Sequence, residues 1–396
     1  MTIHMRLRTI RTHTPRGKRV LYRTDYNVPL GRGASGWRVA NDLRLRKTLP
    51  TLRRLLASRN RVIILTHLGR PEGKPEAKYS LAPVAQRLQR LLGKPVAFVP
   101  DCVGPTVTDA VEQMVPGSIL LLENLRFHPG EKKNDTRFAR QLAKLGDLYV
   151  NDAFGNAHRA DASVSAITRH LPSFAGLLLD EEVRTLAKLL AKPARPFVAI
   201  VGGGKIEDKL GTIRRLLPRV DALLLGGALA NTVLLAKGIQ VGRSRIDRAG
   251  LAHLRSLDLT DTRIHLPVDV VVSHTKTVFR RVERVAVGGV PPRAYIYDIG
   301  PDTAALFASV IARARTVLWA GPLGCFEEPQ FLRGTAQVAR AVARSRAWSV
   351  VGGGDTVSAI AQTGTLNHIS FVSTGGGAML EFLAGKSLPA LRPLIA

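Results

Sequence analysis

One pattern recurs along the 396 residues: a short run of Leu and β-branched residues ends at glycine or polar residues, and a stretch with helical periodicity follows. Such alternation is typical of a parallel α/β sheet with covering helices. A chain of this length with 45% hydrophobic residues can bury more than one core, so we expect two domains. The predicted strands are residues 20–22, 62–65, 119–122, 148–150, 197–201, 222–225, 317–319, 349–351 and 371–373.

The residues that follow these runs differ between the two halves of the chain. In the first half they are charged or polar, as at 23–27 and 66–70, and in the second half they are mostly glycine, as at 202–204 and 352–354. Because ligands of open α/β sheets bind outside the carboxyl ends of the strands, two different ligand surfaces are expected. Arg and His suit a small anion with carboxylate and phosphate groups. Glycine turns instead expose backbone N–H groups at helix N-termini to the phosphates of a nucleotide.

The join between the halves is marked by an amphipathic stretch at 180–190 that ends in a proline-containing segment at 191–196. We therefore expect an N-terminal domain for the acid at 1–180, a hinge helix and linker at 181–195, and a nucleotide domain at 196–375. An acid on one domain and a nucleotide on the other is the arrangement that a kinase needs.

Three charged residues lie directly after glycine turns of the second half. Lys205 and Lys209 are four positions apart, so they share one face of a helix start, where cations oppose the helix dipole unless an anion is bound. They are candidates for phosphate binding, with a solvated helix face as the alternative. Asp355 beside bound phosphates would be a natural magnesium ligand, with an ordinary helix N-cap as the alternative.

Two familiar nucleotide-binding patterns are not supported. Residues 31–36 match GxGxxG, but they neither follow a buried strand nor open an apolar helix, so we interpret them as a loop and disfavour a nicotinamide dehydrogenase. The pattern GxxxxGK[ST] is absent because Ile206 follows Lys205, which excludes an ordinary P-loop enzyme.

The chain is strongly basic, with 58 Lys and Arg against 30 Asp and Glu and a formal net charge of +28. Such a charge suits either nucleic-acid binding or the electrostatic attraction of small polyanions. The basic residues are dispersed, aromatic residues make up only 5% of the chain, and no zinc-finger spacing or aromatic RNA-binding motif occurs. We therefore expect no dedicated nucleic-acid partner.

Cysteine content and hydropathy indicate the compartment. Cys102 and Cys325 are the only cysteines, and their separation predicts neither a disulfide framework nor a zinc-ligand cluster. No apolar run approaches the roughly 18 residues of a membrane span, and the N-terminus has no apolar signal core. We expect a soluble, cytoplasmic protein without a membrane partner.

Many segments occur in the order typical of phosphoglycerate kinases, and the chain resembles that family over residues 20–390. The matching segments are 25–30, 66–71, 123–128, 151–159, 202–209, 321–327, 352–356 and 373–377. The resemblance implies an α/β fold of two Rossmann-like domains with parallel sheets joined by a helical hinge, and a segment 376–396 that returns to the N-terminal domain. It also implies a monomeric enzyme of glycolysis and gluconeogenesis. Such an enzyme transfers a phosphoryl group reversibly between 1,3-bisphosphoglycerate and ADP, giving 3-phosphoglycerate and ATP, with Mg²⁺ and by direct in-line transfer after domain closure.

The resemblance also assigns site residues by matching position. The implied contacts to the acid substrate are Asp25, Tyr26, Asn27, Arg44, His67, Leu68, Gly69, Arg70, Arg126 and Arg159. The implied nucleotide contacts are Lys209, Glu327, Gly353, Gly354, Asp355 and Thr356, with Asp355 as the Mg²⁺ ligand. The groups expected to act in the transfer are Arg44, Lys205, Lys209, Gly353 and Gly354. Asp161 and Ala320 depart from the usual residues at their positions, and Asp161 is expected to bring a negative charge near the basic site.

Overall fold

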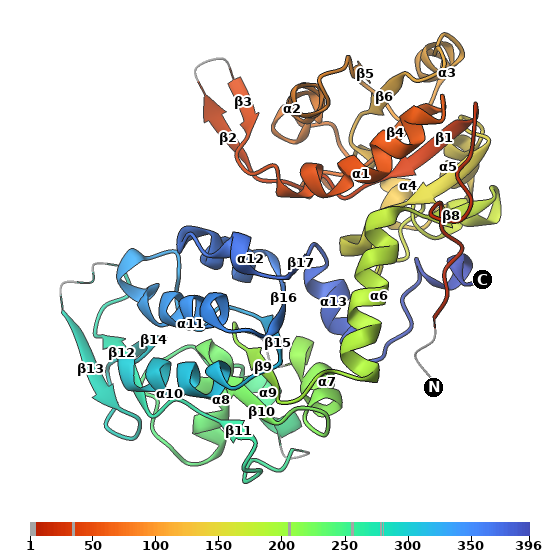
Figure 1. Ribbon diagram of the computed structural model, residues 1–396. Helices are drawn as coiled ribbons and strands as arrows, with labels where there is room; N and C mark the ends of the chain where they lie inside the picture. The colour runs from red at the N-terminus through yellow and green to blue at the C-terminus, as the bar shows by residue number, and fades with distance from the viewer. Residues whose placement is uncertain (1–4, 34–35, 205–206, 255–256, 278, 280) are drawn as a thin grey trace. The chain divides into compact units, whose positions relative to one another are not determined.

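The computed structural model describes residues 5–33, 36–204, 207–254, 257–277, 279 and 281–396 (Figure 1). They form two structural units, one of residues 1–187 with 387–396 and one of residues 188–386. The division falls inside helix α6 (Leu177–Ala191). None of the helices in these described ranges combines the length and apolar character that a membrane crossing requires.

The first unit contains a six-stranded parallel sheet in the order β5-β6-β4-β1-β7-β8. Its strands are β1 (Arg19–Arg23), β4 (Arg61–Leu65), β5 (Ala97–Val99), β6 (Ile119–Leu122), β7 (Leu148–Asn151) and β8 (Ser173–Ala175). Its helices besides α6 are α1 (Leu43–Ala57), α2 (Ala82–Leu92), α3 (Pro105–Glu112), α4 (Pro129–Lys132) and α5 (Thr136–Ala143).

Helices cover both faces of this sheet because alternate residues of each strand point to opposite sides. Val20 and Tyr22 of β1 belong to a core with Leu45 and Leu52 of α1. Leu21, between them, belongs to the second core, which includes residues of α3 and α5. Both faces are therefore apolar, as the short continuous apolar runs predict for a parallel sheet.

The second unit contains a parallel sheet in the order β11-β10-β9-β15-β16-β17. The strands are β9 (Phe197–Val201), β10 (Ala222–Leu225), β11 (Ile264–His265), β15 (Thr316–Ala320), β16 (Trp348–Gly352) and β17 (Phe371–Ser373). The helices are α7 (Glu207–Leu216), α8 (Gly227–Ala236), α9 (Arg248–Leu254), α10 (Pro301–Ala312), α11 (Arg333–Arg344), α12 (Gly354–Gln362) and α13 (Gly376–Leu383). A separate antiparallel sheet, β13-β12-β14, is formed by β12 (Asp269–Ser273), β13 (Val282–Ala286) and β14 (Tyr295–Ile299).

Each run predicted as a strand forms one of the strands of the two parallel sheets, which confirms the predicted α/β class. The interpretation of residues 31–36 as a loop is wrong for those of them that the structure describes. Residues 31–33 and Gly36 belong to an antiparallel hairpin of β2 (Leu30–Gly33) and β3 (Gly36–Val39), whereas residues 34 and 35 lie outside the described residues. The hairpin forms because Leu30 and Val39, which pair across it, both pack against the core of the first unit.

The last two segments of the chain belong to different units. Helix α13 is part of the second unit, where Thr212 donates a hydrogen bond to the carbonyl of Leu380. Residues 387–396 join the first unit, where Ala390 N–H donates to the carbonyl of Ala157 at 3.2 Å. The segment that joins the N-terminal unit therefore begins at residue 387, later than the resemblance implied. The reason is that the apolar face of α13 is buried in the second unit.

Candidate active site

In the first unit, the loops that follow β1, β4 and β6 are tied together at the carboxyl edge of the sheet. Asn27 accepts a hydrogen bond from the Gly69 N–H at 2.9 Å, and Tyr26 N–H donates to the Thr66 hydroxyl at 2.9 Å. Leu68 N–H donates to the Asn124 side chain at 3.2 Å. These bonds bring residues from separate loops to one edge, as expected for neighbouring parallel strands.

His67 lies at the centre of a group of arginines. Its ring is buried, and Nδ1 is 3.4 Å from a guanidinium nitrogen of Arg23. Burial and the surrounding cations hold the pKa of His67 well below its usual value; these cations are Arg23, Arg126, Arg159 and Arg44. The imidazole is therefore neutral at pH 7, and the positive potential around it favours an anion.

Arg126 has unused hydrogen-bonding capacity in this basic cluster. One terminal nitrogen donates to the Gly69 carbonyl at 2.6 Å. Its Nε and Nη2 atoms are buried and have no hydrogen-bond partner within the described ranges of the chain. Burial and then Arg159 lower its pKa to about 10. Buried donors without partners cost free energy, so a carboxylate or phosphate placed here would gain from satisfying them.

The other residues of the predicted acid site differ in whether their side chains are exposed to a ligand. Arg44, in the first turn of α1, forms an ion pair with Asp25. Asn27 and Arg70 are exposed, and Arg159 is partly exposed. Tyr26 and Leu68 are buried, and the Tyr26 hydroxyl bonds to Thr48, so these two could reach a ligand only through their backbone.

Asp161 is also buried at this basic cluster, and one of its carboxylate oxygens has no hydrogen-bond partner in the part of the chain that the structure describes. Its charge acts on Arg126, opposing the fall in that residue's pKa. The expectation that Asp161 brings a negative charge to the basic site is therefore confirmed.

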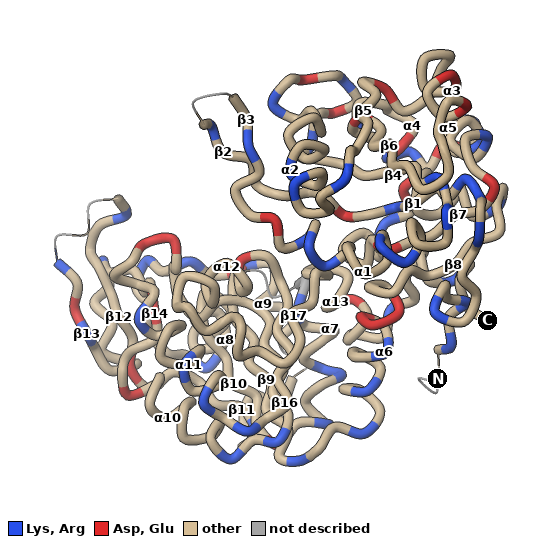
Figure 2. The backbone as a smooth tube through the Cα atoms, turned by 45° about the horizontal axis from the view of Figure 1, so that its top comes forward, with Lys and Arg blue, Asp and Glu red and all other residues tan. Residues whose placement is uncertain are grey.

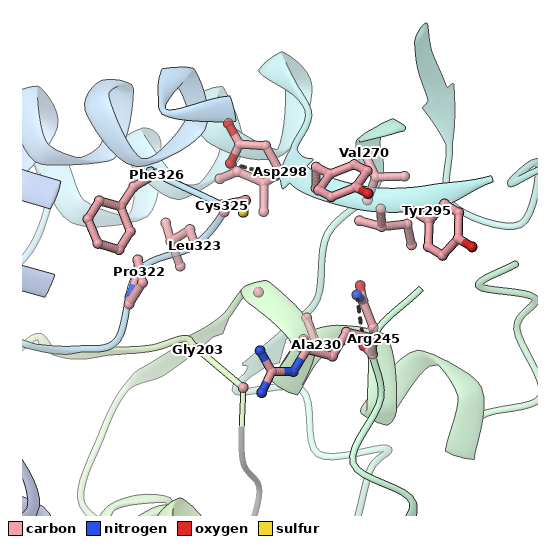
Figure 3. Close-up of a pocket in the computed structure, with 18 of the residues that line it drawn as sticks. Gly203, Ala230, Arg245, Val270, Tyr295, Asp298, Pro322, Leu323, Cys325 and Phe326 are labelled. Atoms are coloured by element: carbon pink, nitrogen blue, oxygen red, sulfur yellow. Dashed lines mark hydrogen bonds between the residues drawn. The ribbon is translucent and has the colours of Figure 1, made fainter. Parts of the chain in front are cut away.

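The second unit contains a cavity of about 550 Å³ between the glycine turns and the antiparallel sheet (Figure 3). Its walls are supplied by the turn after β9, the start of α8, strand β14 and the loop after β15. The two turns approach closely, because a Cβ at Gly202 would lie 2.1 Å from the carbonyl oxygen of Pro322. Only glycine allows this approach, which leaves backbone groups next to the cavity.

The start of α12 presents Asp355 to this cavity. Gly353, with φ of 103°, occupies the N-cap position, so the N-cap alternative for Asp355 is wrong. Asp355 is exposed in the first helical turn and makes no hydrogen bond or ion pair to the described residues. The buried Thr356 hydroxyl accepts a bond from Gly321 N–H at 2.7 Å, which joins α12 to the loop after β15.

The remaining predicted nucleotide residues lie near the same cavity, except Lys205, which is outside the described residues. Lys209 is in the first turn of α7, and its ammonium nitrogen lies 3.5 Å from the position that a Cβ on Gly203 would take. Glu327 is exposed and lines the cavity. Burial, and then Glu327, raise the pKa of Cys325 to about 11.

Sequence reasoning missed several residues that the structure brings to the two sites. Arg23 of the first unit is fully buried beside His67. In the second unit, Arg245 and Tyr295 line the cavity (Figure 3). None of them belongs to a segment that matches the family. Arg23 lies in the charged stretch at 23–27 after a predicted strand, and this position is the one signal that could have identified it as a site residue.

Comparison with known proteins agrees with the geometry. The family model described as phosphoglycerate kinase matches residues 10–386. The chain is 46% identical over 398 residues to the phosphoglycerate kinase of Pelotomaculum thermopropionicum, covering 99% of this chain and 100% of that protein. It is 50% identical over 378 residues to that of Moorella thermoacetica, covering 94% and 95%.

Solved structures extend this similarity to the fold. The phosphoglycerate kinase of Coxiella burnetii matches with a TM-score of 0.82 and 38% identity, covering 98% of this chain and 99% of that one. The enzyme from Pyrococcus horikoshii matches with a TM-score of 0.86 and 31% identity, covering 98% of each. With two α/β units, a basic cluster in one and a glycine-lined cavity in the other, the chain belongs to the phosphoglycerate kinase family.

Proposed function

We propose that the chain transfers a phosphoryl group reversibly between 1,3-bisphosphoglycerate and ADP, yielding 3-phosphoglycerate and ATP. The observation that carries this proposal is the pair of buried, unpartnered donors on Arg126, in a cluster of arginines around a neutral His67. An anion with several oxygens would satisfy them, and 3-phosphoglycerate carries both a carboxylate and a phosphate.

The N-terminal domain is proposed to bind the acid and the C-terminal domain the nucleotide. In the first, the side chains of Arg44, Arg70, Arg126 and Arg159 would contact the acid's charged groups, with Asn27 as a neutral partner. In the second, the cavity is lined by glycine turns and by Tyr295, an apolar and polar mixture that suits a nucleotide base and its phosphates.

Asp355 is the proposed ligand for Mg²⁺, which accompanies the nucleotide as cofactor. The fit rests on an exposed carboxylate with no partner among the described residues, at a helix start that lines the cavity. Carboxylates are preferred ligands of Mg²⁺. When bound, the ion neutralises the charge of the phosphates.

The proposed mechanism is direct in-line transfer without a covalent intermediate. The acceptor oxygen is already ionised in ADP and in the carboxylate of 3-phosphoglycerate, so no general base is needed. The protein's contribution is positioning and charge stabilisation. We assign these tasks to Arg44, Lys205, Lys209 and the backbone N–H groups of Gly353 and Gly354.

Compartment and assembly are also proposals. We propose a cytoplasmic location, because both cysteines are free thiols, as a reducing compartment would keep them. We also propose a monomer, as the resemblance to the family implies. Light scattering coupled to size exclusion would measure the mass directly.

The test is a coupled assay of ATP formation from 1,3-bisphosphoglycerate and ADP, with the reverse reaction used to measure KM. Arg126→Lys keeps the charge but removes the planar donors, and one hydrogen bond to a charged group contributes about 1.5–3 kcal/mol. The KM for 3-phosphoglycerate should therefore rise roughly 10- to 100-fold, with the KM for ATP unchanged.

The matched control is Arg61→Lys, because Arg61 also donates a hydrogen bond to a backbone carbonyl, that of Met114. Arg61 is the first residue of β4, whereas the proposed acid site lies at the carboxyl ends of the strands. This variant should leave both KM values unchanged. If Arg126→Lys leaves the KM for 3-phosphoglycerate at the wild-type value, the proposed acid site is wrong.

A further inference from the structure

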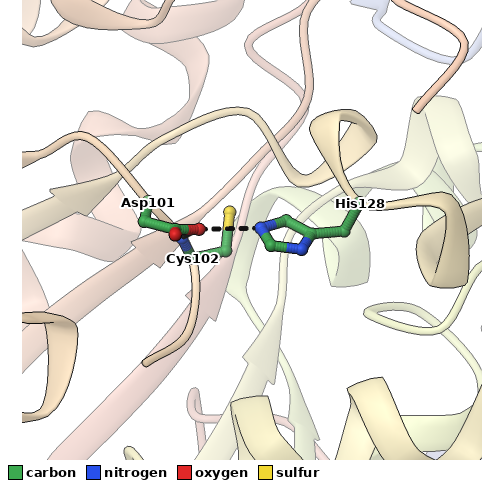
Figure 4. Close-up of side chains that lie close together, drawn as sticks. All are labelled: Asp101, Cys102 and His128. Atoms are coloured by element: carbon green, nitrogen blue, oxygen red, sulfur yellow. Dashed lines mark hydrogen bonds and ion pairs between the residues drawn. The ribbon is translucent and has the colours of Figure 1, made fainter. Parts of the chain in front are cut away.

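A second group of donor atoms lies in the first unit (Figure 4). Asp101 and Cys102 lie in the loop after β5, separated from the strand by Pro100, and His128 lies between a 3-10 turn (Leu125–Phe127) and α4. The Asp101 carboxylate is 2.7 Å from Nε2 of His128. A carboxylate oxygen, a thiol sulfur and an imidazole nitrogen all lie within 4.8 Å of one another.

Packing holds two of these side chains in place. The His128 ring stacks on Phe138 with centroids 4.9 Å apart. Cys102 is fully buried, and its thiol donates to the carbonyl oxygen of Glu123 at 2.8 Å. Their positions are therefore set by the core and by the edge of the sheet.

The group is open on one side. The Asp101 side chain is 52% exposed, and all three residues line a cavity of about 310 Å³. The buried carboxylate of Glu123 lines the same cavity, but both of its oxygens already accept hydrogen bonds from Ser80 and from two backbone N–H groups. An ion could therefore enter from solvent and would meet three donors, with a water molecule as the fourth.

We propose that Asp101, Cys102 and His128 form a binding site for a thiophilic divalent cation of the zinc type. Zinc takes thiolate, imidazole and carboxylate ligands at about 2.0–2.3 Å and accepts three protein ligands plus water. The cation would replace the Asp101–His128 hydrogen bond and the bond from the Cys102 thiol.

This site differs in chemistry from the proposed Mg²⁺ ligand. Mg²⁺ prefers oxygen ligands, whereas sulfur and imidazole select zinc-like ions. Burial and the neighbouring carboxylates keep the pKa of Cys102 well above its usual value, so the bound cation must displace the thiol proton. The inference does not rest on the proposed function, since none of its residues is assigned to the transfer.

The test uses Co²⁺ as a spectroscopic substitute for Zn²⁺, titrated into the full chain after treatment with chelator. Coordination by a thiolate produces a sulfur-to-cobalt charge-transfer absorption, which should saturate at one equivalent. The band should disappear in Cys102→Ala and persist in Cys325→Ala, the matched variant at the only other cysteine. A band that is absent from the wild type, or that survives Cys102→Ala, overturns the proposal.

His128→Gln gives an independent answer if Cys102→Ala fails to fold. Removing a ligand should weaken Zn²⁺ binding at least as much as the roughly 10- to 100-fold that loss of an outer-shell partner causes. The control is His13→Gln, because His13 also stacks on a phenylalanine, Phe174, in the same unit. Equal Zn²⁺ affinities of the wild type and His128→Gln, measured by competition with a chromophoric chelator, would overturn the site.

Discussion

At the scale of single residues, burial decides the chemistry of the proposed acid site. His67 and Arg126 are both buried among cations. Burial and neighbouring arginines lower the pKa of each, so the charged form of each side chain is less stable here than in water. Such an arrangement costs stability, which is expected where an anion binds. Sequence motifs placed both residues at strand ends, but the unpartnered donors of Arg126 are set by packing in three dimensions.

His67 predicts a pH dependence of stability. Its folded-state pKa is well below its usual value, so its stabilising contribution is present above about pH 6.5 and is lost as the pH falls toward the folded pKa. Relative to His67→Gln, the wild type should lose free energy of unfolding between pH 7.5 and pH 5.5. Urea denaturation of both proteins measures this difference, and parallel curves over that range would contradict the assignment.

At the scale of elements, short links between loops and helices position the site. Asp152 follows β7 and accepts a hydrogen bond from Leu179 N–H in the first turn of α6, at 2.9 Å. The Tyr22 hydroxyl of β1 donates to its other oxygen at 2.7 Å. One carboxyl group therefore joins two strands of the sheet to α6.

Asp152 predicts a pH dependence of the opposite sign. Burial raises its pKa from 3.8 to about 6, which corresponds to about 3 kcal/mol. A raised carboxyl pKa contributes stability below about pH 4, and this is lost as the pH rises through about 6. The free energy of unfolding of the wild type, relative to Asp152→Asn, should fall by about that amount between pH 4 and pH 7.

Denaturant titrations at the two pH values would measure this change. Asparagine keeps an acceptor for Leu179, and the Tyr22 hydroxyl can donate instead to the Thr48 carbonyl, 3.2 Å away. The variant should therefore fold. A difference that does not change with pH would show that burial does not raise the pKa of Asp152.

The elements that could be predicted from sequence are those with a strong local signal. Apolar runs that end at glycine or charged residues identified most strands of both parallel sheets. β5, β8 and β11 have only two or three residues, and β13 (Val-Glu-Arg-Val-Ala) has neither a continuous apolar run nor a regular alternation of apolar and polar residues, so their pairing depends on distant partners. Asp101 and Cys102 are likewise separated from His128 in sequence, and only the order of strands β5 and β6 brings them together.

At the scale of the whole molecule, Lys and Arg are spread along both units (Figure 2). This distribution agrees with the dispersed basic residues of the sequence and suits the electrostatic attraction of small polyanions.

The proposal that acid and nucleotide bind to different domains requires closure about residues 181–195 before transfer. Closure would also exclude water, which otherwise hydrolyses the acyl phosphate. Small-angle X-ray scattering should show a smaller radius of gyration with 3-phosphoglycerate and a non-hydrolysable Mg-ATP analogue together than with neither. The same radius in both states would contradict closure.

In the proposed function, two separate ligand surfaces serve one transfer reaction. Hydrogen–deuterium exchange, measured with each substrate alone, shows whether the acid and the nucleotide bind to different segments of the chain. 3-Phosphoglycerate should protect the backbone at residues 25–27, 67–69 and 124–127, whereas Mg-ADP should protect residues 202–204, 321–327 and 353–357. Protection of the same segments by both ligands, or of the opposite sets, would contradict the account.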